Sequence, residues 1–119
     1  MQKLIIKGGK PLNGCVDVQG SKNAVLPILS ACLLVKGKTY LSNVPKLSDV
    51  FLTIELLEGL GCKVEWEEEV LIIDASNIKT SVVNSETASK IRSSITLLGA
   101  LISRCGEATI NYPGVCFKF

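Results

Sequence analysis

Apolar residues recur every three or four positions in three stretches of the chain, and each stretch predicts an amphipathic helix. The first helix is expected over about residues 23–35. The second begins at its capping residue Ser48 and ends at Gly61, which favours a helix terminus. The third is expected over about residues 86–103, where the sequence becomes strongly apolar. Three helices of this length point to a folded, helix-containing domain.

Short segments between these helices show the alternation of apolar and polar residues that is typical of strands. They are residues 39–42, 63–66, 70–74 and 108–111, with two further segments, 4–7 and 15–18, near the start of the chain. A glycine-rich turn would join the first two as a hairpin. The acidic run Glu67 to Glu69 joins two others and is expected to be a solvated hairpin rather than a metal site.

The order of these elements repeats within the chain. Lys22 and Lys90 are 68 residues apart, as are Pro45 and Pro113, and each lysine follows a serine and precedes an apolar helix. Tandem copies of a supersecondary unit bury a complete core only against further copies. We therefore predict one incomplete domain over residues 1–119, with repeat units at about 20–75 and 86–119.

Composition narrows the choice of partner. Thirteen basic and eleven acidic residues are mixed along the 119-residue chain and give a net charge of +2. Aromatic residues make up only 5%, which argues against a stacking platform for nucleic acid. The longest apolar runs are far shorter than a bilayer-spanning helix. We expect a cytoplasmic protein with a small-molecule ligand, without nucleic-acid partners and without membrane insertion.

The turn from Gly20 to Asn23 joins a predicted strand to a predicted helix. Backbone N–H groups and the positive end of a helix dipole would face a ligand there, and Lys22 adds a full charge. This pattern fits a phosphate or carboxylate, although a solvated lysine beside an ordinary helix cap explains the spacing equally well. Arg92 offers a second cation, with the planar fork that suits the same anions, although an arginine on a helix surface is usually only solvated.

Five cysteines and no histidine leave no pattern for a zinc site or a disulfide framework. Cys32 lies within an apolar helix and is expected to be a core residue. Cys15, Cys62 and Cys105 each adjoin a glycine at an element boundary and are expected to be partly buried. Cys116 follows the turn signal Tyr112-Pro113-Gly114 and is expected on an exposed loop, where a thiol can be reactive.

Several motifs occur together in the order of a known family. They are Gly20-Ser21-Lys22-Asn23-Ala24, Asn43-Val44-Pro45-Lys46-Leu47-Ser48-Asp49-Val50, Leu60-Gly61-Cys62-Lys63-Val64, Ile91-Arg92-Ser93-Ser94 and Pro113-Gly114-Val115-Cys116. In this order the chain resembles the N-terminal part of the UDP-N-acetylglucosamine enolpyruvyl transferases (1-carboxyvinyltransferases). The resemblance implies an α/β fold, an inside-out barrel built from βαβαββ repeats, which is here incomplete with about one and a half repeats.

The resemblance also implies a reaction. The enolpyruvyl group of phosphoenolpyruvate would pass to the 3'-hydroxyl of UDP-N-acetylglucosamine with release of phosphate, the first committed step of peptidoglycan synthesis, without cofactor or metal. Lys22 and Arg92 match residues that bind phosphoenolpyruvate, and Asn23 matches a residue that contacts the sugar nucleotide. Cys116 matches the cysteine that acts as general acid, adds covalently to phosphoenolpyruvate and is alkylated by fosfomycin.

The chain also departs from the family pattern. Val115 stands where the family has a second glycine, and the segment after Cys116 lacks the arginine expected there. Because family members are several times longer, we expect a truncated chain, or one completed by a separate polypeptide, that is inactive by itself. Two alternatives remain: a non-catalytic fragment with at most weak ligand binding, and the sister enzyme that acts on shikimate 3-phosphate. Asn23 and Cys116 count against the sister enzyme.

Overall fold

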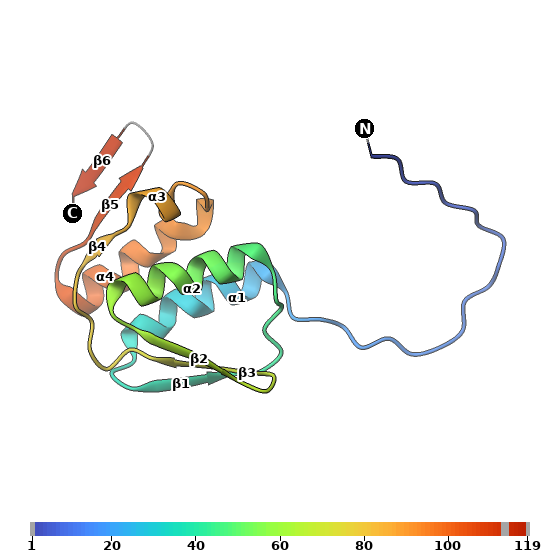
Figure 1. The fold of residues 1–119 in the computed structure, drawn as a ribbon, viewed down its shortest axis with the longest axis horizontal. Helices are drawn as coiled ribbons and strands as arrows, with labels where there is room; N and C mark the ends of the chain where they lie inside the picture. The colour runs from blue at the N-terminus through green and yellow to red at the C-terminus, as the bar shows by residue number, and fades with distance from the viewer. Residues whose placement is uncertain (1, 113–114, 119) are drawn as a thin grey trace.

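The structure is a computed structural model that describes residues 2–112 and 115–118. Helices and strands are mixed along the chain after residue 21 (Figure 1). The elements are α1 (Lys22–Ala31), η1 (Cys32–Leu34), β1 (Lys38–Leu41), α2 (Ser48–Leu60), β2 (Lys63–Glu67), β3 (Val70–Asp74), β4 (Val82–Val83), α3 (Ser85–Ala88), η2 (Arg92–Ile95), α4 (Thr96–Cys105), β5 (Thr109–Tyr112) and β6 (Val115–Lys118). The mixed α/β class predicted from the sequence is confirmed.

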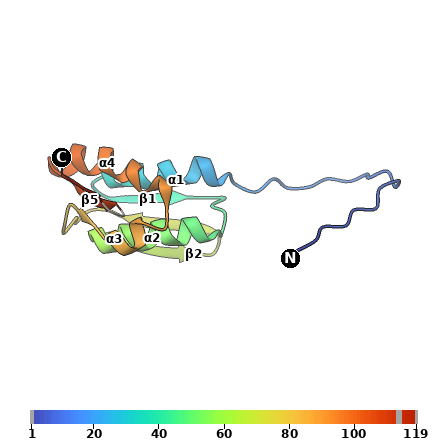
Figure 2. The ribbon, with the colours of Figure 1, turned by 90° about the horizontal axis from the view of Figure 1, so that it is seen from above.

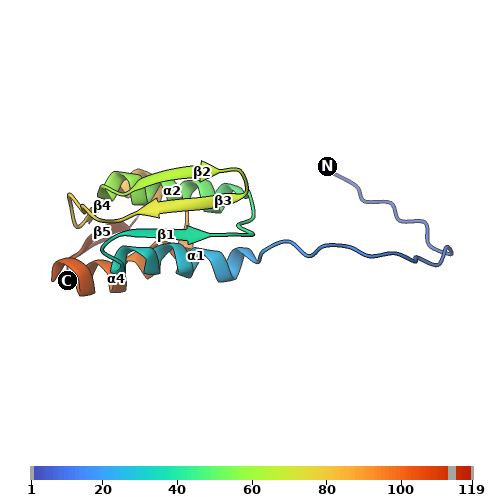
Figure 3. The ribbon, with the colours of Figure 1, turned by 90° about the horizontal axis from the view of Figure 1, so that it is seen from below.

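The first sheet contains three antiparallel strands in the order β1-β3-β2. Side chains of the central strand, β3, point alternately to the two faces of the sheet. Leu71 and Ile73 are fully buried, whereas Ile72 between them is only partly covered. Helices α1 and α2 run alongside these strands, as Figure 3 shows. The strands predicted at 39–42, 63–66 and 70–74 are therefore confirmed to within a residue.

Helix α2 ends as the sequence predicts, at a glycine. Gly61 adopts φ +110°, and its N–H donates to the Glu58 carbonyl, while Cys62 N–H donates to the Leu57 carbonyl. This pair of bonds satisfies carbonyls that the helix end leaves open. The start differs by one residue, because Ser48 is the first helical residue and Leu47 occupies the cap position without a side-chain hydrogen bond.

The predicted helix over residues 86–103 is wrong in its first half. The chain forms the single turn α3, then η2, and only then the regular helix α4. Ser94 explains the break, because its hydroxyl donates to the carbonyls of Ala88 and Ile91 at 3.2 and 2.8 Å. Ser89 likewise donates to the Glu86 carbonyl at 2.8 Å. Serine hydroxyls that bond to nearby carbonyls compete with the regular helix.

A second sheet has the order β4-β5-β6, with β4 parallel to β5 and β6 antiparallel to it. A parallel pair requires a crossover connection, and α3, η2 and α4 provide it. The strand predicted at 108–111 is confirmed as β5, whereas β4 and β6 were not predicted. The two valines of β4 are too few to show an alternation.

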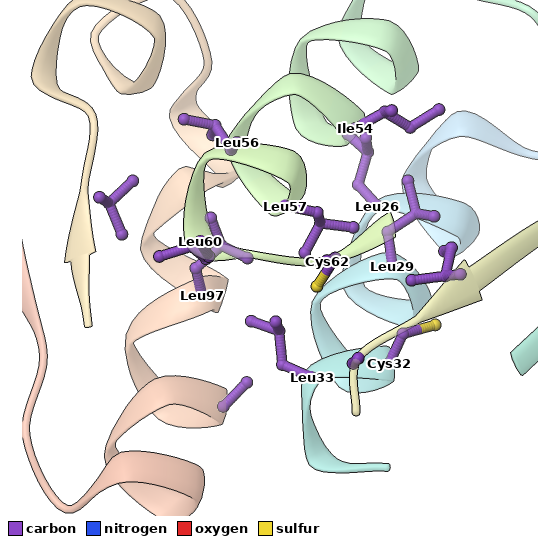
Figure 4. Packing of buried hydrophobic residues seen from close by; sticks show 14 of the residues in the cluster. Leu26, Leu29, Cys32, Leu33, Ile54, Leu56, Leu57, Leu60, Cys62 and Leu97 are labelled. Atoms are coloured by element: carbon purple, nitrogen blue, oxygen red, sulfur yellow. The ribbon is translucent and has the colours of Figure 1, made fainter. Parts of the chain in front are cut away.

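One hydrophobic core joins the elements around the first sheet to the elements around the second sheet. Leucines from α1, η1, α2 and α4 point toward one another between the helices, as the close view in Figure 4 shows for Leu29, Leu33, Leu57, Leu60 and Leu97. Each of these side chains is at most 1% exposed. A hydrogen bond of 2.7 Å between the hydroxyls of Ser30 and Thr96 adds a polar contact between α1 and α4. The helices therefore pack as a single body.

Arg104, in the last turn of α4, ties this core to the end of the first sheet. Its guanidinium donates to the carbonyls of Leu33 at 3.2 Å, Ala75 at 2.9 Å and Ser76 at 3.3 Å. Leu33 lies in η1, which follows α1, and the other two residues follow β3 directly. One side chain therefore holds three separate segments together.

The hairpin predicted from segments 4–7 and 15–18 is not formed. Residues 2–20 contain no strand or helix and extend away from the rest of the molecule (Figures 1 and 2). Their large apolar side chains, among them Leu4, Ile6, Leu12 and Val16, are 80 to 98% exposed. Alternation predicts a strand only where a partner covers its apolar face, and no described part of the chain covers this one.

Candidate functional site

Just before helix α1 begins, the backbone at Gly20 lies very close to the backbone at Asn43. A Cβ atom at Gly20 would lie far inside van der Waals contact with the Asn43 carbonyl oxygen and within 3.1 Å of the Pro45 ring. Only glycine fits this position without a backbone shift. Asn43 itself adopts the left-handed conformation with φ +55°. The segment that contains Asn43 and Pro45, after β1, therefore packs directly against the start of α1, where Lys22 lies.

Lys22 is the first residue of α1, and its ammonium forms an ion pair with Asp49. The distance from Nζ to Oδ2 is 3.0 Å, and the two side chains are 47% and 32% exposed. Asp49 lies in the first turn of α2, so the pair joins the N-termini of two neighbouring helices. No described side chain caps either helix start. The predicted cation is therefore present at a helix start, with a carboxylate that sequence reasoning did not assign to it.

A shallow recess of about 260 Å³ lies beside this helix start. Gly20 and Asn43 line it together with Lys46 and Glu69, whose side chains form an ion pair at 3.4 Å. The Lys46 ammonium also lies 5.2 Å from the centre of the half-buried Trp66 ring, a cation–π distance. The acidic hairpin thus supplies one surface ion pair.

The other predicted site residues are distributed over three elements. Asn23 follows Lys22 in the first turn of α1, where it is exposed. Arg92 begins η2, the short helical turn that leads into α4, and its side chain lies outside the described part of the structure. The structure therefore brings Lys22 and Asn23 together on one helix, with Asp49 beside Lys22.

Cys116 lies in strand β6, opposite Asn111 of β5, and not on a loop as predicted. The turn signal at residues 113 and 114 falls outside the described residues. The strand follows from Val115 and Phe117, which are good strand formers and find a partner in β5. The side chain of Cys116 also lies outside the described part, so its contacts with Lys22 or Arg92 are not defined.

Two of the remaining cysteines are buried and two are exposed. Burial raises the pKa of the Cys62 thiol to about 11, and nearby Cys32 adds to this rise. Burial also raises the pKa of Cys32. These assignments confirm the core role of Cys32, whereas the expected partial burial of Cys15 and Cys105 is wrong because both are exposed. A thiol that stays protonated is a poor nucleophile, so neither buried cysteine is a candidate for chemistry.

Two kinds of feature are absent from residues 2–112 and 115–118. No helix there is long and apolar enough to cross a membrane. No group of three or more cysteine, aspartate or glutamate side chains is placed there to hold a metal ion.

Comparisons with known proteins place the chain in a family. Residues 6–117 match the EPSP synthase (3-phosphoshikimate 1-carboxyvinyltransferase) family. Three proteins named UDP-N-acetylglucosamine 1-carboxyvinyltransferase are similar to it: those of Rickettsia bellii strain OSU 85-389 at 47% identity, Hydrogenovibrio crunogenus at 48% and Coxiella burnetii strain RSA 493 at 46%. Each match covers 98% of this chain but only 27 to 28% of the relative.

A solved structure supports the fold. The enolpyruvyl transferase NikO from Streptomyces tendae matches 86% of this chain and 24% of its own, with 25% sequence identity and a TM-score of 0.73. The predicted fold of the enolpyruvyl transferases, present here as an incomplete barrel, is thus confirmed. The chain belongs to the EPSP synthase family of carboxyvinyl transferases and corresponds to the N-terminal part of its relatives.

Proposed function

We propose that this chain supplies one side of an enolpyruvyl transferase site that uses phosphoenolpyruvate and UDP-N-acetylglucosamine. The enolpyruvyl group would pass to the 3'-hydroxyl of the sugar nucleotide with release of phosphate, as the first committed step of peptidoglycan synthesis in the cytoplasm. The observation that carries the proposal is the 46 to 48% identity, over 98% of the chain, to relatives named for this acceptor.

The chemistry assigns a role to each candidate residue. Addition to phosphoenolpyruvate followed by elimination of phosphate needs cations for a phosphate and a carboxylate, which Lys22 and Arg92 would provide. Asn23 would contact the sugar nucleotide. Protonation of the enolpyruvyl methylene carbon needs a general acid, and Cys116 would supply it, since an ordinary thiol is largely protonated at neutral pH.

The chain spans about 28% of its curated relatives, so the other side of the site would come from a further polypeptide segment. A complementing chain is therefore part of the proposal. Without it, we expect at most weak ligand binding and no turnover. The exposed apolar residues between positions 4 and 18 favour this view, because they leave surface for such a segment to cover. Shikimate 3-phosphate remains a less favoured acceptor, because the 46 to 48% identical relatives are named for the sugar nucleotide.

Peptide-resolved mass spectrometry of the fosfomycin-treated chain tests the site. The measurement is the rate of alkylation at each cysteine, with and without UDP-N-acetylglucosamine. We expect Cys116 to react faster than the exposed Cys15 and Cys105, and the sugar nucleotide to accelerate this reaction alone. Replacing Lys22 with methionine removes the cation and is expected to abolish the acceleration.

The two exposed cysteines are the internal control for general thiol reactivity. Equal rates at Cys116, Cys15 and Cys105, unchanged by the nucleotide, would show that the chain alone forms no part of the site. Acceleration by shikimate 3-phosphate in place of UDP-N-acetylglucosamine would identify the sister reaction instead.

A further inference from the structure

Lys22 occupies an electrostatically unfavourable place. It is the first residue of α1, and its ammonium also approaches the first turn of α2, so two positive helix ends lie close to one cation. Cations are destabilised at helix N-termini, whereas carboxylates are stabilised there. A lysine whose side chain is 47% exposed has room to swing into solvent, away from both helix ends. Something must hold the ammonium where it is.

Asp49 is the group that does so. Its carboxylate lies 3.0 Å from the Lys22 ammonium, and its place in the first turn of α2 stabilises its own charge. The first turn of α2, which carries Asp49, makes a further contact with a buried side chain. The hydroxyl of the buried Thr53 donates to the Asp49 carbonyl oxygen at 2.8 Å. The carboxylate is therefore presented from a regular helix rather than from a loop.

The geometry leaves Lys22 free to act on a ligand. An ammonium group has three N–H donors, and among the described residues the contact with Asp49 uses one of them. The other two N–H groups are on the same nitrogen atom. Because Asp49 restricts the position of that atom, it also restricts where these two donors can lie. Lysine normally loses considerable rotamer freedom when it binds an anion, and a side chain that is already held loses less.

We propose that Asp49 is a positioning residue that holds the Lys22 ammonium at the start of α1, ready for the phosphate or carboxylate of the substrate. This inference rests on the proposed function, which gives Lys22 an anion to bind. Asp49 itself does not contact the anion, and its effect passes through the lysine.

Side-chain NMR of the whole chain, labelled with ¹³C and ¹⁵N in lysine, tests this proposal. The Lys22 ammonium signal is assigned by its loss in Lys22→Arg. Two quantities are measured: the order parameter of the Lys22 side chain, and its shift during titration with phosphoenolpyruvate and with inorganic phosphate. In Asp49→Asn we expect a lower order parameter for Lys22 and an anion affinity reduced by about two- to fivefold, as suits an exposed ion pair.

The second ion pair provides a matched control. Glu69→Gln removes the carboxylate partner of Lys46, at 3.4 Å, and is expected to change the Lys46 signal while leaving Lys22 order and anion affinity unchanged. Asp49→Glu keeps the charge and is expected to restore part of both Lys22 quantities. A merely structural Asp49 would instead lower thermal stability without a specific effect on Lys22.

The outcomes separate this proposal from the proposed function. An unchanged Lys22 order parameter in Asp49→Asn, or an unchanged or tighter anion affinity with that variant, overturns the positioning role. If the wild-type Lys22 signal responds to neither anion, the proposed anion site fails in the isolated chain. The order parameter then decides the positioning role alone: a loss in Asp49→Asn supports it, and no loss overturns it.

Discussion

Replacing Arg104 with methionine tests how strongly its side chain holds α4 to η1 and to the end of β3. Methionine keeps much of the aliphatic stem but removes the guanidinium, which donates to three carbonyls on two other segments. Leu33 is fully buried and so is the Ala75 side chain, so water replaces the lost donors poorly at these carbonyls. The variant therefore leaves acceptors unsatisfied at both Leu33 and Ala75.

Bonds from a charged donor contribute about 1.5–3 kcal/mol each when they are well formed. Two of the three Arg104 bonds are longer than 3.1 Å, and the side chain is partly exposed, so the three are not simply additive. We expect Arg104→Met to lower the free energy of unfolding by about 2–3 kcal/mol in total. For a domain of this size, that corresponds to a fall in Tm of roughly 8–12 °C.

Urea unfolding followed by circular dichroism measures this change. Arg104→Lys is the informative comparison, because it keeps the charge but loses the planar fork, and we expect it to recover less than half of the loss. Lys90, an exposed residue before η2, serves as the control, and Lys90→Met is expected to change stability by less than about 0.5 kcal/mol. An Arg104→Met variant as stable as this control would refute the reasoning.

Three further predictions concern other parts of the molecule. In the same urea unfolding experiment, Gly20→Ala is expected to lower the free energy of unfolding by roughly 1–3 kcal/mol because its Cβ meets backbone, whereas Gly59→Ala, in open space within α2, should be neutral or stabilising. With a pKa of about 11, Cys62 should resist iodoacetamide at pH 8 in the folded chain while exposed Cys15 reacts, and equal peptide labelling would contradict its burial. Hydrogen bonds from Ser76, aided by nearby lysines, lower the pKa of Asp74, so its stabilisation is present above about pH 4 and is lost as pH falls through the lowered value. The stability difference between wild type and Asp74→Asn should therefore shrink as the pH falls below about 4, and a difference that does not change with pH would contradict this assignment.

Local pattern was sufficient for much of the fold. Helices α1 and α2 and strands β2 and β3 follow from apolar periodicity together with stop signals such as Gly61, because both kinds of signal are local in the sequence. The break at Ser94 could not be read from periodicity, since it depends on where one hydroxyl finds carbonyl acceptors. The apolar alternation at residues 4–18 is real, but it became no strand because no described segment pairs with it.

Some features of the candidate site were likewise predictable from the sequence and others were not. Lys22 was predicted at the start of a helix, and the structure confirms that place. Asp49 was not predicted as the partner of Lys22, since sequence spacing does not show that two helix starts lie side by side. Cys116 was predicted on a loop because turn residues precede it, yet its neighbours pair with β5. The roles of Lys22, Asn23, Arg92 and Cys116 stay predictions.

Reconstitution of enolpyruvyl transfer tests the central claim most directly. The chain would be mixed with a polypeptide carrying the part of the Hydrogenovibrio crunogenus relative that lies beyond its match to this chain, and phosphate release would be measured with phosphoenolpyruvate and UDP-N-acetylglucosamine. The account predicts release that requires both polypeptides and both substrates, and that Lys22→Met abolishes. A complex that forms but releases no phosphate, or releases it equally with Lys22→Met, would contradict the claim that this chain carries one side of the site.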